Sequence, residues 1–381
     1  MIFTATCSLG MEECLAKELK SLNLQRVHSE RAAVRFHSKS LADAYRACIQ
    51  SRIASRILLR IHRFQGQESN DLYGGIQSIN WSDHLPRNTA IWIDVVGTTK
   101  QLRHSQFTAR LAKDAIVDQL REKGLSRPSV DRDHGLRIHI HIRNGVFTIS
   151  LDLSGQSLHW RTPNRQSNAA PLKETLAAYL LHLAEWPKKG REGVALVDAM
   201  SGSGTLALEA ASIALNIAPN LNRRAWGFHY WANHNETHFQ EERQRARHNY
   251  KSTLPTRIIA ADIDRNCIGY IKANAKSRLI SGIEVKAANF LHQPPLMSET
   301  GIVVLNPPYG ERLEDPEASY QMFSDIGDTL KQHYSDWSAY ILCPSKQHRH
   351  RIRLRHAERT EVFNGQLRCQ WLCYQMYSGS R

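Results

Sequence analysis

The chain lacks the sequence features of secreted, zinc-binding and membrane-spanning proteins. Its seven cysteines are an odd number, and no two of them have Cys-x-x-Cys spacing, which argues against a zinc site and against a disulfide framework. No apolar run approaches the length of a membrane span. The N-terminus has no basic segment and carries Glu12 and Glu13, so no signal peptide is expected. These absences predict a cytoplasmic protein with reduced thiols, no metal ion and no membrane partner.

An excess of basic residues is the clearest feature of the composition. The 381 residues include 50 Lys and Arg against 36 Asp and Glu, for a net charge of +14 at pH 7. Such an excess indicates a polyanionic partner such as nucleic acid or an anionic surface. With 41% hydrophobic residues, a chain of this length is expected to form two or three domains with packed cores.

A predicted buried strand at residues 303–305 stops abruptly at the sequence Asn-Pro-Pro-Tyr-Gly. Two consecutive prolines remove two backbone donors, so the loop presents carbonyl oxygens and the amide of Asn306. Together with the ring of Tyr309, these acceptors suit the exocyclic amine and the flat face of a nucleobase. A proline-rich turn that merely ends a strand is the plain alternative. The candidate catalytic residues are Asn306, Pro307, Pro308 and Tyr309.

A second motif begins with a predicted strand at residues 194–198, which ends in Asp198. A Gly-x-Gly turn at residues 202–204 and an Ala-rich helix follow. Glycines let a cofactor approach the backbone, and the helix N-terminus offers free N–H groups. The spacing also fits Gly-x-Gly-x-x-Ala, so a nicotinamide dinucleotide has to be weighed. Two helix caps beside a structural glycine turn are the purely structural alternative.

The acids around this motif favour a different cofactor. Asp198 precedes the glycines, where it would repel a pyrophosphate, and the next predicted strand, residues 257–261, ends much later in Asp262 and Asp264. Carboxylates at two strand ends suit a cofactor that has hydroxyl groups and a positive charge but no phosphates. S-adenosylmethionine is such a molecule.

Three stretches in this order, residues 198–205, 262–264 and 306–310, resemble class I methyltransferases that act on exocyclic amino groups. Further stretches narrow the resemblance to the bacterial THUMP-domain RNA methyltransferases, nearest to the 23S ribosomal RNA guanine-N2 methyltransferase group; they are residues 3–12, 169–177 and 218–231. The resemblance covers nearly the whole chain. It implies an α/β fold class, with a C-terminal class I (Rossmann-like) methyltransferase domain on a seven-stranded sheet, preceded by α+β ferredoxin-like and THUMP domains.

The expected domains are a ferredoxin-like domain at 1–64, a THUMP RNA-binding domain at 65–160 and the methyltransferase domain at 161–381. The first should read strand, helix, strand, helix, strand. In the second, residues 136–143 alternate as a strand, with Ile138, Ile140 and Ile142 facing inward. We expect its outward side chains to form a solvated sheet face rather than a direct RNA contact or a histidine metal site; they are Arg137, His139, His141 and Arg143. Asn144 and Gly145 predict a hairpin turn.

The resemblance implies S-adenosylmethionine-dependent methylation of the exocyclic N2 amine of a guanine in ribosomal RNA, with 23S ribosomal RNA as the preferred substrate. Alternatives are an N6-adenine methyltransferase on RNA or DNA, which uses the same loop, a tRNA guanine-N2 methyltransferase, and a non-catalytic RNA-binding or assembly factor. Larger members of the family carry a second methyltransferase domain, so this chain is expected to make a single modification. The oligomeric state is not predicted. The expected cofactor-binding residues are Pro171, Leu172, Lys173, Thr175, Asp198, Met200, Gly202, Ser203, Gly204, Thr205, Asp262, Ile263, Asp264, Asn289, Phe290 and Asn306.

Individual roles follow from the same resemblance and from side-chain chemistry. Asp198 should lie near the methionine amino group and Asp262 should bind the ribose hydroxyls, whereas Asp264 suits a helix cap. Asn289 stands where the family has the Asp that receives the adenine amine, and its amide oxygen can still accept. The basic run at residues 346–356 is expected to follow RNA phosphates rather than to be only a solvated helix face.

Overall fold

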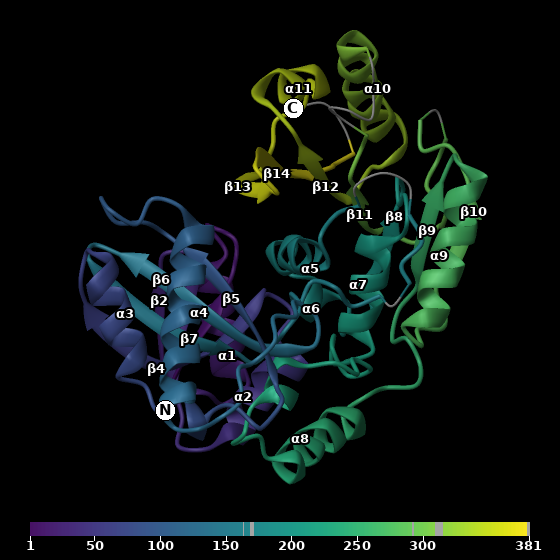
Figure 1. The fold of residues 1–381 in the computed structure, drawn as a ribbon. Coiled ribbons are helices and arrows are strands. Elements are labelled where there is room, and N and C mark those ends of the chain that lie inside the picture. The colour runs from purple at the N-terminus through teal and green to yellow at the C-terminus, as the bar shows by residue number, and fades with distance from the viewer. Residues whose placement is uncertain (163, 168–170, 292, 309–314, 379–381) are drawn as a thin grey trace. The chain divides into compact units, whose positions relative to one another are not determined.

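The computed structural model describes residues 1–162, 164–167, 171–291, 293–308 and 315–378 (Figure 1). Contacts along the chain divide it into two compact units. The first unit comprises Met1–Cys7, Leu15–Leu158 and Asn220–Arg245, and the second comprises Ser8–Cys14, His159–Pro219 and Ala246–Arg381. Each unit contains its own seven-stranded sheet. The described part of the chain has no helix that combines the length and the apolar character needed to span a membrane.

The sheet of the first unit has the strand order β2-β3-β1-β4-β7-β6-β5. Its strands are β1 (Ile2–Thr6), β2 (Gln25–Glu30), β3 (Ala33–His37), β4 (Arg56–Gln65), β5 (Ala90–Val96), β6 (Gly135–Arg143) and β7 (Val146–Asp152). Its helices are α1 (Glu12–Ser21), α2 (Leu41–Gln50), α3 (Ser69–Gln77), η1 (Trp81–Asp83), α4 (Ser105–Glu122) and η2 (Gly227–Tyr230). Because β4 pairs with both β1 and β7, the ferredoxin-like and THUMP parts share one continuous sheet.

Local sequence rules account for a helix cap and a hairpin turn of this unit. Ser40 caps α2 by accepting from the Ala42 N–H at 3.1 Å, as its sequence position predicts. Asn144 and Gly145 both have positive φ, 51° and 69°, which is the geometry of a tight hairpin turn. The structure adds β2 to the expected order of strands and helices. This strand is polar, exposed and at the edge of the sheet, so no alternation reveals it.

The outward face of β6 is less exposed than expected at two positions, Arg137 and His139; His139 is half-buried and its Nδ1 is buried. Ile138, Ile140 and Ile142 are buried, as predicted. The prediction for Arg137 is wrong, because its side chain is buried, donates to the Gly155 carbonyl and lies 3.5 Å from a carboxylate oxygen of Asp94. The period-2 pattern identifies the face of a strand correctly, but it cannot show that the loop after β7 covers one end of that face.

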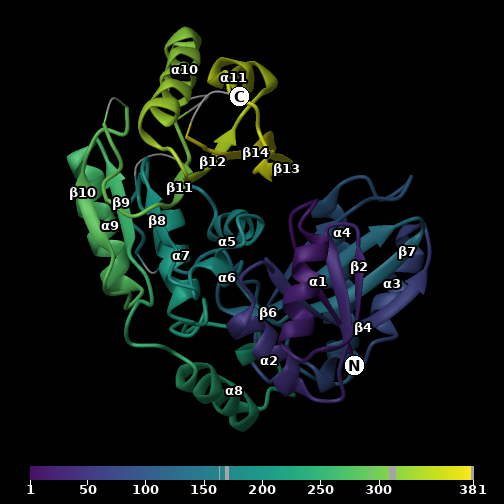
Figure 2. The same cartoon turned by 180° about the vertical axis from the view of Figure 1, so that it is seen from behind.

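Residues 220–245 lie between two strands of the second sheet in sequence but belong to the first unit. In both views α8 (Glu236–His248) lies beside α2 (Figures 1 and 2). The guanidinium of Arg46 on α2 bonds both carboxylate oxygens of buried Glu242, each at 2.9 Å. Tyr45 packs its ring against Phe228 and Phe239 of the same segment, with centroids 4.8 and 5.8 Å apart. The segment is therefore an integral part of the first unit.

The sheet of the second unit has the strand order β10-β9-β8-β11-β12-β14-β13. Its strands are β8 (Ala195–Asp198), β9 (Ile258–Asp262), β10 (Glu284–Ala287), β11 (Gly301–Leu305), β12 (Ser338–Cys343), β13 (Glu358–Asn364) and β14 (Leu367–Gln375). Its helices are α5 (Glu174–Leu183), α6 (Trp186–Lys189), α7 (Thr205–Ala214), α9 (Arg265–Ser277), α10 (Pro316–His333) and α11 (Lys346–Ile352). Strands β8 to β12 are parallel, and β14 returns antiparallel beside β12. This is the expected class I methyltransferase sheet.

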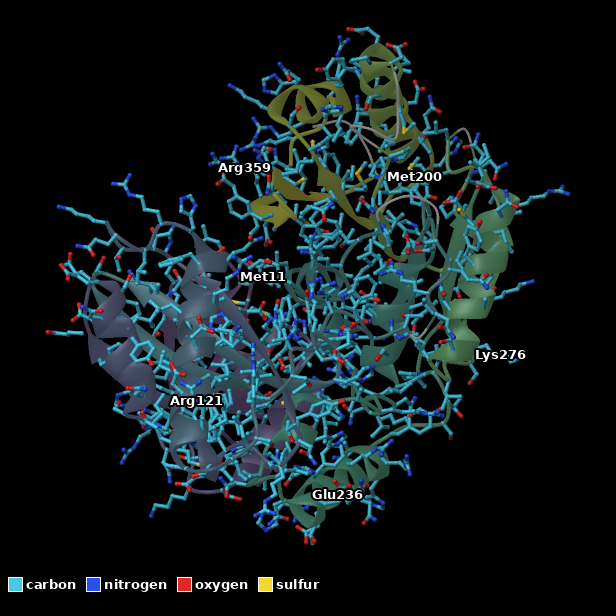
Figure 3. The ribbon with its side chains drawn as sticks, in the orientation of Figure 1. Met11, Arg121, Met200, Glu236, Lys276 and Arg359 are labelled. Carbon is cyan, nitrogen blue, oxygen red and sulfur yellow. The ribbon has the colours of Figure 1, made fainter. Side chains whose placement is uncertain are left out.

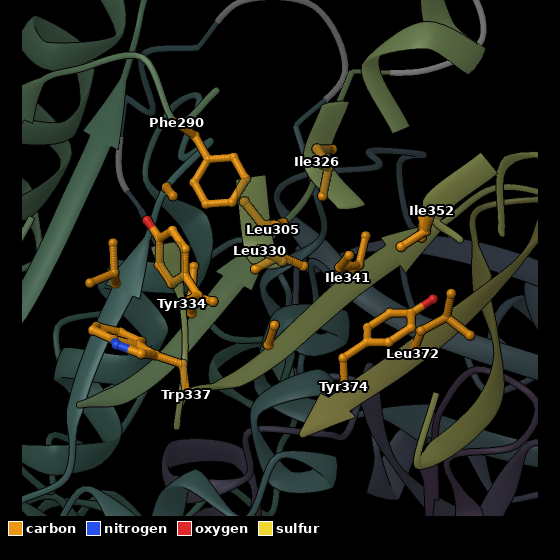
Figure 4. Close-up of a cluster of buried hydrophobic side chains, with 14 of the residues drawn as sticks. Phe290, Leu305, Ile326, Leu330, Tyr334, Trp337, Ile341, Ile352, Leu372 and Tyr374 are labelled. Atoms are coloured by element: carbon orange, nitrogen blue, oxygen red, sulfur yellow. The ribbon is translucent and has the colours of Figure 1, made fainter. Parts of the chain in front are cut away.

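A hydrophobic cluster fixes the centre of this sheet (Figure 4). Leu305 of β11 and Ile341 of β12 point into it, and Ile326 and Leu330 of α10 cover them. All four side chains are fully buried. Leu305 is the last residue of β11, so the loop that begins at Asn306 starts from a rigid part of the core.

Candidate functional site

The chain order of the second sheet reverses between β8 and β11. The two strands run parallel, and Asp198 at the end of β8 lies opposite Val304 of β11. The next neighbour, β9, ends at Asp262. In open α/β sheets, ligands bind outside the carboxyl ends of the strands at such a reversal. Asp198, Asp262 and Asn306 are brought to this edge from three strands that are far apart in sequence.

A cavity of about 540 Å³ opens at this edge of the sheet. Met200, which lines it, is labelled in Figure 3. The predicted site residues that line the cavity are Pro171, Leu172, Asp198, Met200, Gly202, Ser203, Thr205, Asp262, Ile263, Asp264, Asn289, Phe290, Asn306 and Pro308. Those described but outside the lining are Lys173, Thr175, Gly204 and Pro307. Tyr309 lies outside the described residues.

Asp198 is almost completely buried beneath the glycine turn, with 1% of its surface exposed. One of its carboxylate oxygens accepts from the Ala207 N–H at 3.0 Å, and the other has no partner among the described residues. Burial, together with the nearby charge of Asp262, raises the pKa of Asp198 to about 7. A cation in the cavity would therefore be attracted to Asp198 and would favour its ionised form.

Asp262 links the end of β9 to the glycine turn. Its carboxylate accepts from the Gly202 N–H at 2.8 Å and from the Asp264 N–H at 2.9 Å. Asp264 caps α9 by accepting from the Asn266 N–H at 2.8 Å, as its chemistry predicts. Asp262 is only partly buried and lines the cavity, so its carboxylate remains available to a ligand.

The turn itself requires glycine at residue 204. Gly204 has φ of +84°, in the left-handed region, and a Cβ atom there would lie 3.0 Å from the Ile271 side chain of α9. A larger residue would be strained in its backbone and would press against that helix. The glycine thus sets the distance between the turn and α9, although it does not line the cavity.

Two asparagines of the cavity differ in their hydrogen bonding. The Asn289 side-chain oxygen accepts from the Leu291 N–H at 3.1 Å. The Asn306 side-chain oxygen is buried and has no partner among the described residues. An unpaired buried acceptor costs free energy, so its retention at the mouth of a cavity points to a ligand that donates to it. Asn306 lines the same cavity as the glycine turn and carries an acceptor that no described residue uses.

The sequence pattern did not reveal Arg165, which lies in a stretch that reads as a polar linker. Its side chain is only 9% exposed and pairs with Glu174 at 3.1 Å. It donates to the Ser203 hydroxyl at 3.2 Å and also to the Thr205 hydroxyl. A proline suits the first turn of a helix, so Pro171 would predict a helix start, but α5 begins three residues later at Glu174. Helical periodicity alone gives no sign that Met322 of α10 also lines the cavity.

One group of described side chains, in the first unit, has the spacing of a metal site. Ligand atoms of His229, His234 and Glu236 lie within 4.8 Å of one another. The Tyr45 hydroxyl accepts from the Asn235 N–H, so its own proton is directed to Nδ1 of His234 at 2.9 Å. Nε2 of His234 then donates to Glu236 at 2.8 Å. This hydrogen-bond chain satisfies both nitrogens of His234 without an ion.

Comparison with known proteins agrees with this geometry. The family described as "RMKL-like, methyltransferase domain" matches residues 161–372. The RlmL ferredoxin-like domain matches residues 2–58, and the THUMP domain matches residues 67–152. The chain is 36% identical over 386 residues to a ribosomal RNA large subunit methyltransferase K/L of Syntrophotalea carbinolica, covering 98% of the chain and 53% of that protein. It is 37% identical over 380 residues to one of Pseudomonas aeruginosa, covering 97% and 52%.

Solved structures match this chain over nearly its whole length. A crystal structure described as a possible methylase from Clostridium difficile 630 has a TM-score of 0.87 at 27% identity and covers 100% of this chain and 99% of its own. A predicted N6-adenine-specific DNA methylase from Listeria monocytogenes has a TM-score of 0.85 at 27% identity and covers 98% and 96%. The chain spans about half the length of the curated relatives it matches. Because the family match extends over more than half of its residues, the chain belongs to the RMKL-like methyltransferase family.

Proposed function

We propose that the chain is an S-adenosylmethionine-dependent RNA methyltransferase that methylates the exocyclic N2 amine of a guanine in ribosomal RNA. The preferred substrate in this proposal is the 23S ribosomal RNA. The observation that carries the proposal is the unpaired, buried side-chain oxygen of Asn306 beside the cavity. It is an unused acceptor on a residue that lines the cavity, and an exocyclic amine is a donor that also acts as the nucleophile.

The cavity residues fit S-adenosylmethionine. Its ammonium and sulfonium charges suit a lining that includes Asp198, Asp262 and Asp264, and its ribose hydroxyls suit the Asp262 carboxylate. The described lining contains no lysine, arginine or histidine. A dinucleotide would place two phosphates against these acids. A structure of SMU.472, a protein assigned as a methyltransferase and crystallised with SAH, has the same fold, with a TM-score of 0.85 at 24% identity.

The residues of the chain would orient the exocyclic amine of the base and would not need to deprotonate the base ring. The lone pair of an aromatic amine is delocalised, so it has to be localised and directed before it can attack. The Asn306 oxygen and the Pro307 carbonyl would accept the two amino hydrogens, which favours a tetrahedral nitrogen. Bound S-adenosylmethionine would supply the methyl group on its sulfonium. Most of the acceleration would come from orientation and proximity, and the amine proton would leave to water.

The domain composition supports RNA as the substrate. We take residues 1–64, 65–160 and 161–381 as the ferredoxin-like, THUMP and methyltransferase domains, with the first two carrying the RNA. The net charge of +14 and the exposed Lys346, Arg351 and Arg355 in and after α11 suit phosphate contacts. The relatives in Syntrophotalea and Pseudomonas are described as large subunit ribosomal RNA enzymes, which supports ribosomal rather than transfer RNA. Such a protein would work in the cytoplasm.

Methylation of the N6 amine of adenine is the second candidate function. The Asn-Pro-Pro loop accepts from an exocyclic amine of either base, and the Listeria relative is described as an N6-adenine-specific DNA methylase. The THUMP match over residues 67–152 favours RNA over DNA. Nucleoside mass spectrometry of ribosomal RNA from cells that lack the protein, incubated with the chain and S-adenosylmethionine, tests both candidates. We expect N2-methylguanosine; N6-methyladenosine or an unmodified RNA would refute the assignment.

A further inference from the structure

We propose that Arg165 is a positioning residue that directs the hydroxyls of Ser203 and Thr205 at the carboxylate of the cofactor's methionine end. The inference rests on the proposed function, because it concerns how the same cavity holds S-adenosylmethionine. The carboxylate is the one negative group of that cofactor, and Arg165 would be its cationic partner. Arg165 lies behind the glycine turn and does not line the cavity.

The hydrogen bonds of Arg165 use both ends of its guanidinium. Nη2 donates to the Ser203 hydroxyl oxygen at 3.2 Å and also to the Thr205 hydroxyl oxygen. Nη1 donates to the Leu172 carbonyl at 3.3 Å and pairs with Glu174 at 3.1 Å. Three of the four hydrogens on these two nitrogens form hydrogen bonds, and Nη1 also forms the ion pair with Glu174. Arg165 does not line the cavity, so it acts on a ligand there through the two hydroxyls.

The hydroxyls of Ser203 and Thr205 each keep a proton that can be donated to a ligand. Ser203 and Thr205 both line the cavity, and each accepts from the guanidinium. Because an oxygen that accepts from Arg165 turns its own O–H elsewhere, each proton is available to an acceptor. Neither hydroxyl donates to another residue in the described ranges. Ser201, in the same turn, differs, because its hydroxyl donates to the Asp198 carbonyl at 2.7 Å.

Buried arginines lie behind the turn, and Arg165 is the one that bonds its hydroxyls. Three buried arginines and two buried glutamates form neighbouring pairs there; the pairs are Arg161 with Glu209, Arg278 with Glu209, and Arg165 with Glu174. A buried guanidinium acts strongly on the groups that it bonds. The hydroxyls of Ser203 and Thr205 accept from Arg165 and line the cavity, so they would be polarised donors toward a carboxylate there.

The amino acid end of the cofactor fits this arrangement at both of its charges. Asp198 has a buried oxygen without a described partner, which suits the ammonium group. The carboxylate would then meet the two hydroxyls and the first turn of α7, whose N–H groups and dipole also favour an anion. The subsite formed by Asp198, Ser203 and Thr205 would thus be specific for a zwitterion, whereas Asp262 would bind the ribose of any adenosine ligand.

The test compares two ligands on the full chain by calorimetry. S-adenosylhomocysteine carries the ammonium and carboxylate groups, and 5′-methylthioadenosine carries neither. In Arg165→Gln we expect affinity for S-adenosylhomocysteine to fall about 10- to 100-fold, and that for 5′-methylthioadenosine to stay nearly constant. Ser203→Ala, which leaves the buried ion pairs intact, should show the same selectivity at about 2- to 10-fold. Ser201→Ala is the matched control and should leave the ratio of the two affinities unchanged.

The outcomes separate this inference from the proposed function. If both ligands weaken equally in Arg165→Gln and in Ser203→Ala, Arg165 only maintains the shape of the turn and the inference is wrong. It is equally wrong if neither ligand weakens, or if Ser201→Ala gives the same selectivity as Ser203→Ala. If the unaltered chain binds neither ligand, the proposed function is refuted, and the inference, which depends on it, is refuted as well. If Arg165→Gln does not fold, the comparison of Ser203→Ala with Ser201→Ala decides alone.

Discussion

Replacing Asn306 with alanine should separate chemistry from binding and from stability. The substitution removes a buried side-chain oxygen that has no partner among the described residues. Leu305 before it is fully buried in the core, and Pro307 after it is buried with a restricted φ. The backbone of the loop is therefore expected to stay in place, so that the variant differs from the parent chain only in the missing acceptor.

The expected magnitudes have opposite signs for stability and turnover. A buried polar group without a partner costs about 1–3 kcal/mol, so its removal should leave the free energy of unfolding unchanged or raise it by up to that amount. The same oxygen is proposed to bind the amine as it becomes positively charged during methyl transfer. Removal of one such preorganised group typically lowers kcat by about 10²–10³-fold. Affinity for the cofactor should not change.

Three measurements on Asn306→Ala check this pattern: thermal unfolding, calorimetric titration with S-adenosylhomocysteine, and single-turnover methyl transfer to RNA. Asn289→Ala is the matched control, because its oxygen accepts from the Leu291 N–H in the same cavity. That variant should lose cofactor affinity and retain turnover at saturating cofactor. Normal turnover in Asn306→Ala, or a loss of turnover that merely follows a loss of cofactor affinity, would refute the reasoning.

Four further predictions concern other parts of the chain. Asp262→Ala should weaken cofactor binding by about 10- to 100-fold in calorimetry, since it removes a charged acceptor for the ribose and the bond to Gly202. The pKa of Asp198 is about 7 in the folded chain, above its ordinary value of 3.8, so the folded chain binds one more proton than the unfolded chain between these two pH values. The free energy of unfolding should therefore fall as the pH rises from about 4 to about 7. Asp198→Asn should lack this slope. Neutralising Lys346, Arg351 and Arg355 should reduce the salt slope of RNA binding by about 2 to 3 units, whereas neutralising Lys272 and Lys276 on α9 should not. Glu242→Ala should destabilise the first unit by about 1–3 kcal/mol in denaturant unfolding, because it removes both bonds between Glu242 and Arg46 and leaves Arg46 only its ion pair with Asp43.

The second sheet could be predicted from sequence because each of its signals is local. Buried parallel strands read as short apolar runs, and the residues that end them, Asp198, Asp262 and Asn306, stand directly after those runs. The rule that ligands bind at the carboxyl ends of parallel strands then places these residues together. The structure confirms that they line one cavity with Gly202 and Ser203.

The parts that could not be predicted depend on contacts between distant segments. Arg165 reads as one more polar residue of a linker, and only the fold places it against Ser203 and Thr205, about forty residues further on. The strand β2 has no apolar face, so it shows no periodicity. Arg137 alternates correctly with its neighbours but is covered by the loop that contains Gly155. Sequence periodicity shows which face of an element is apolar, but not which segment later covers the other face.

A crystal structure of the chain with S-adenosylhomocysteine tests the central claim most directly. We expect the ribose against Asp262, the amino acid end between Asp198 and the turn at residues 202–205, and the sulfur facing Asn306 across the cavity. A ligand bound elsewhere, or one in the cavity with its sulfur turned away from Asn306, would contradict the account.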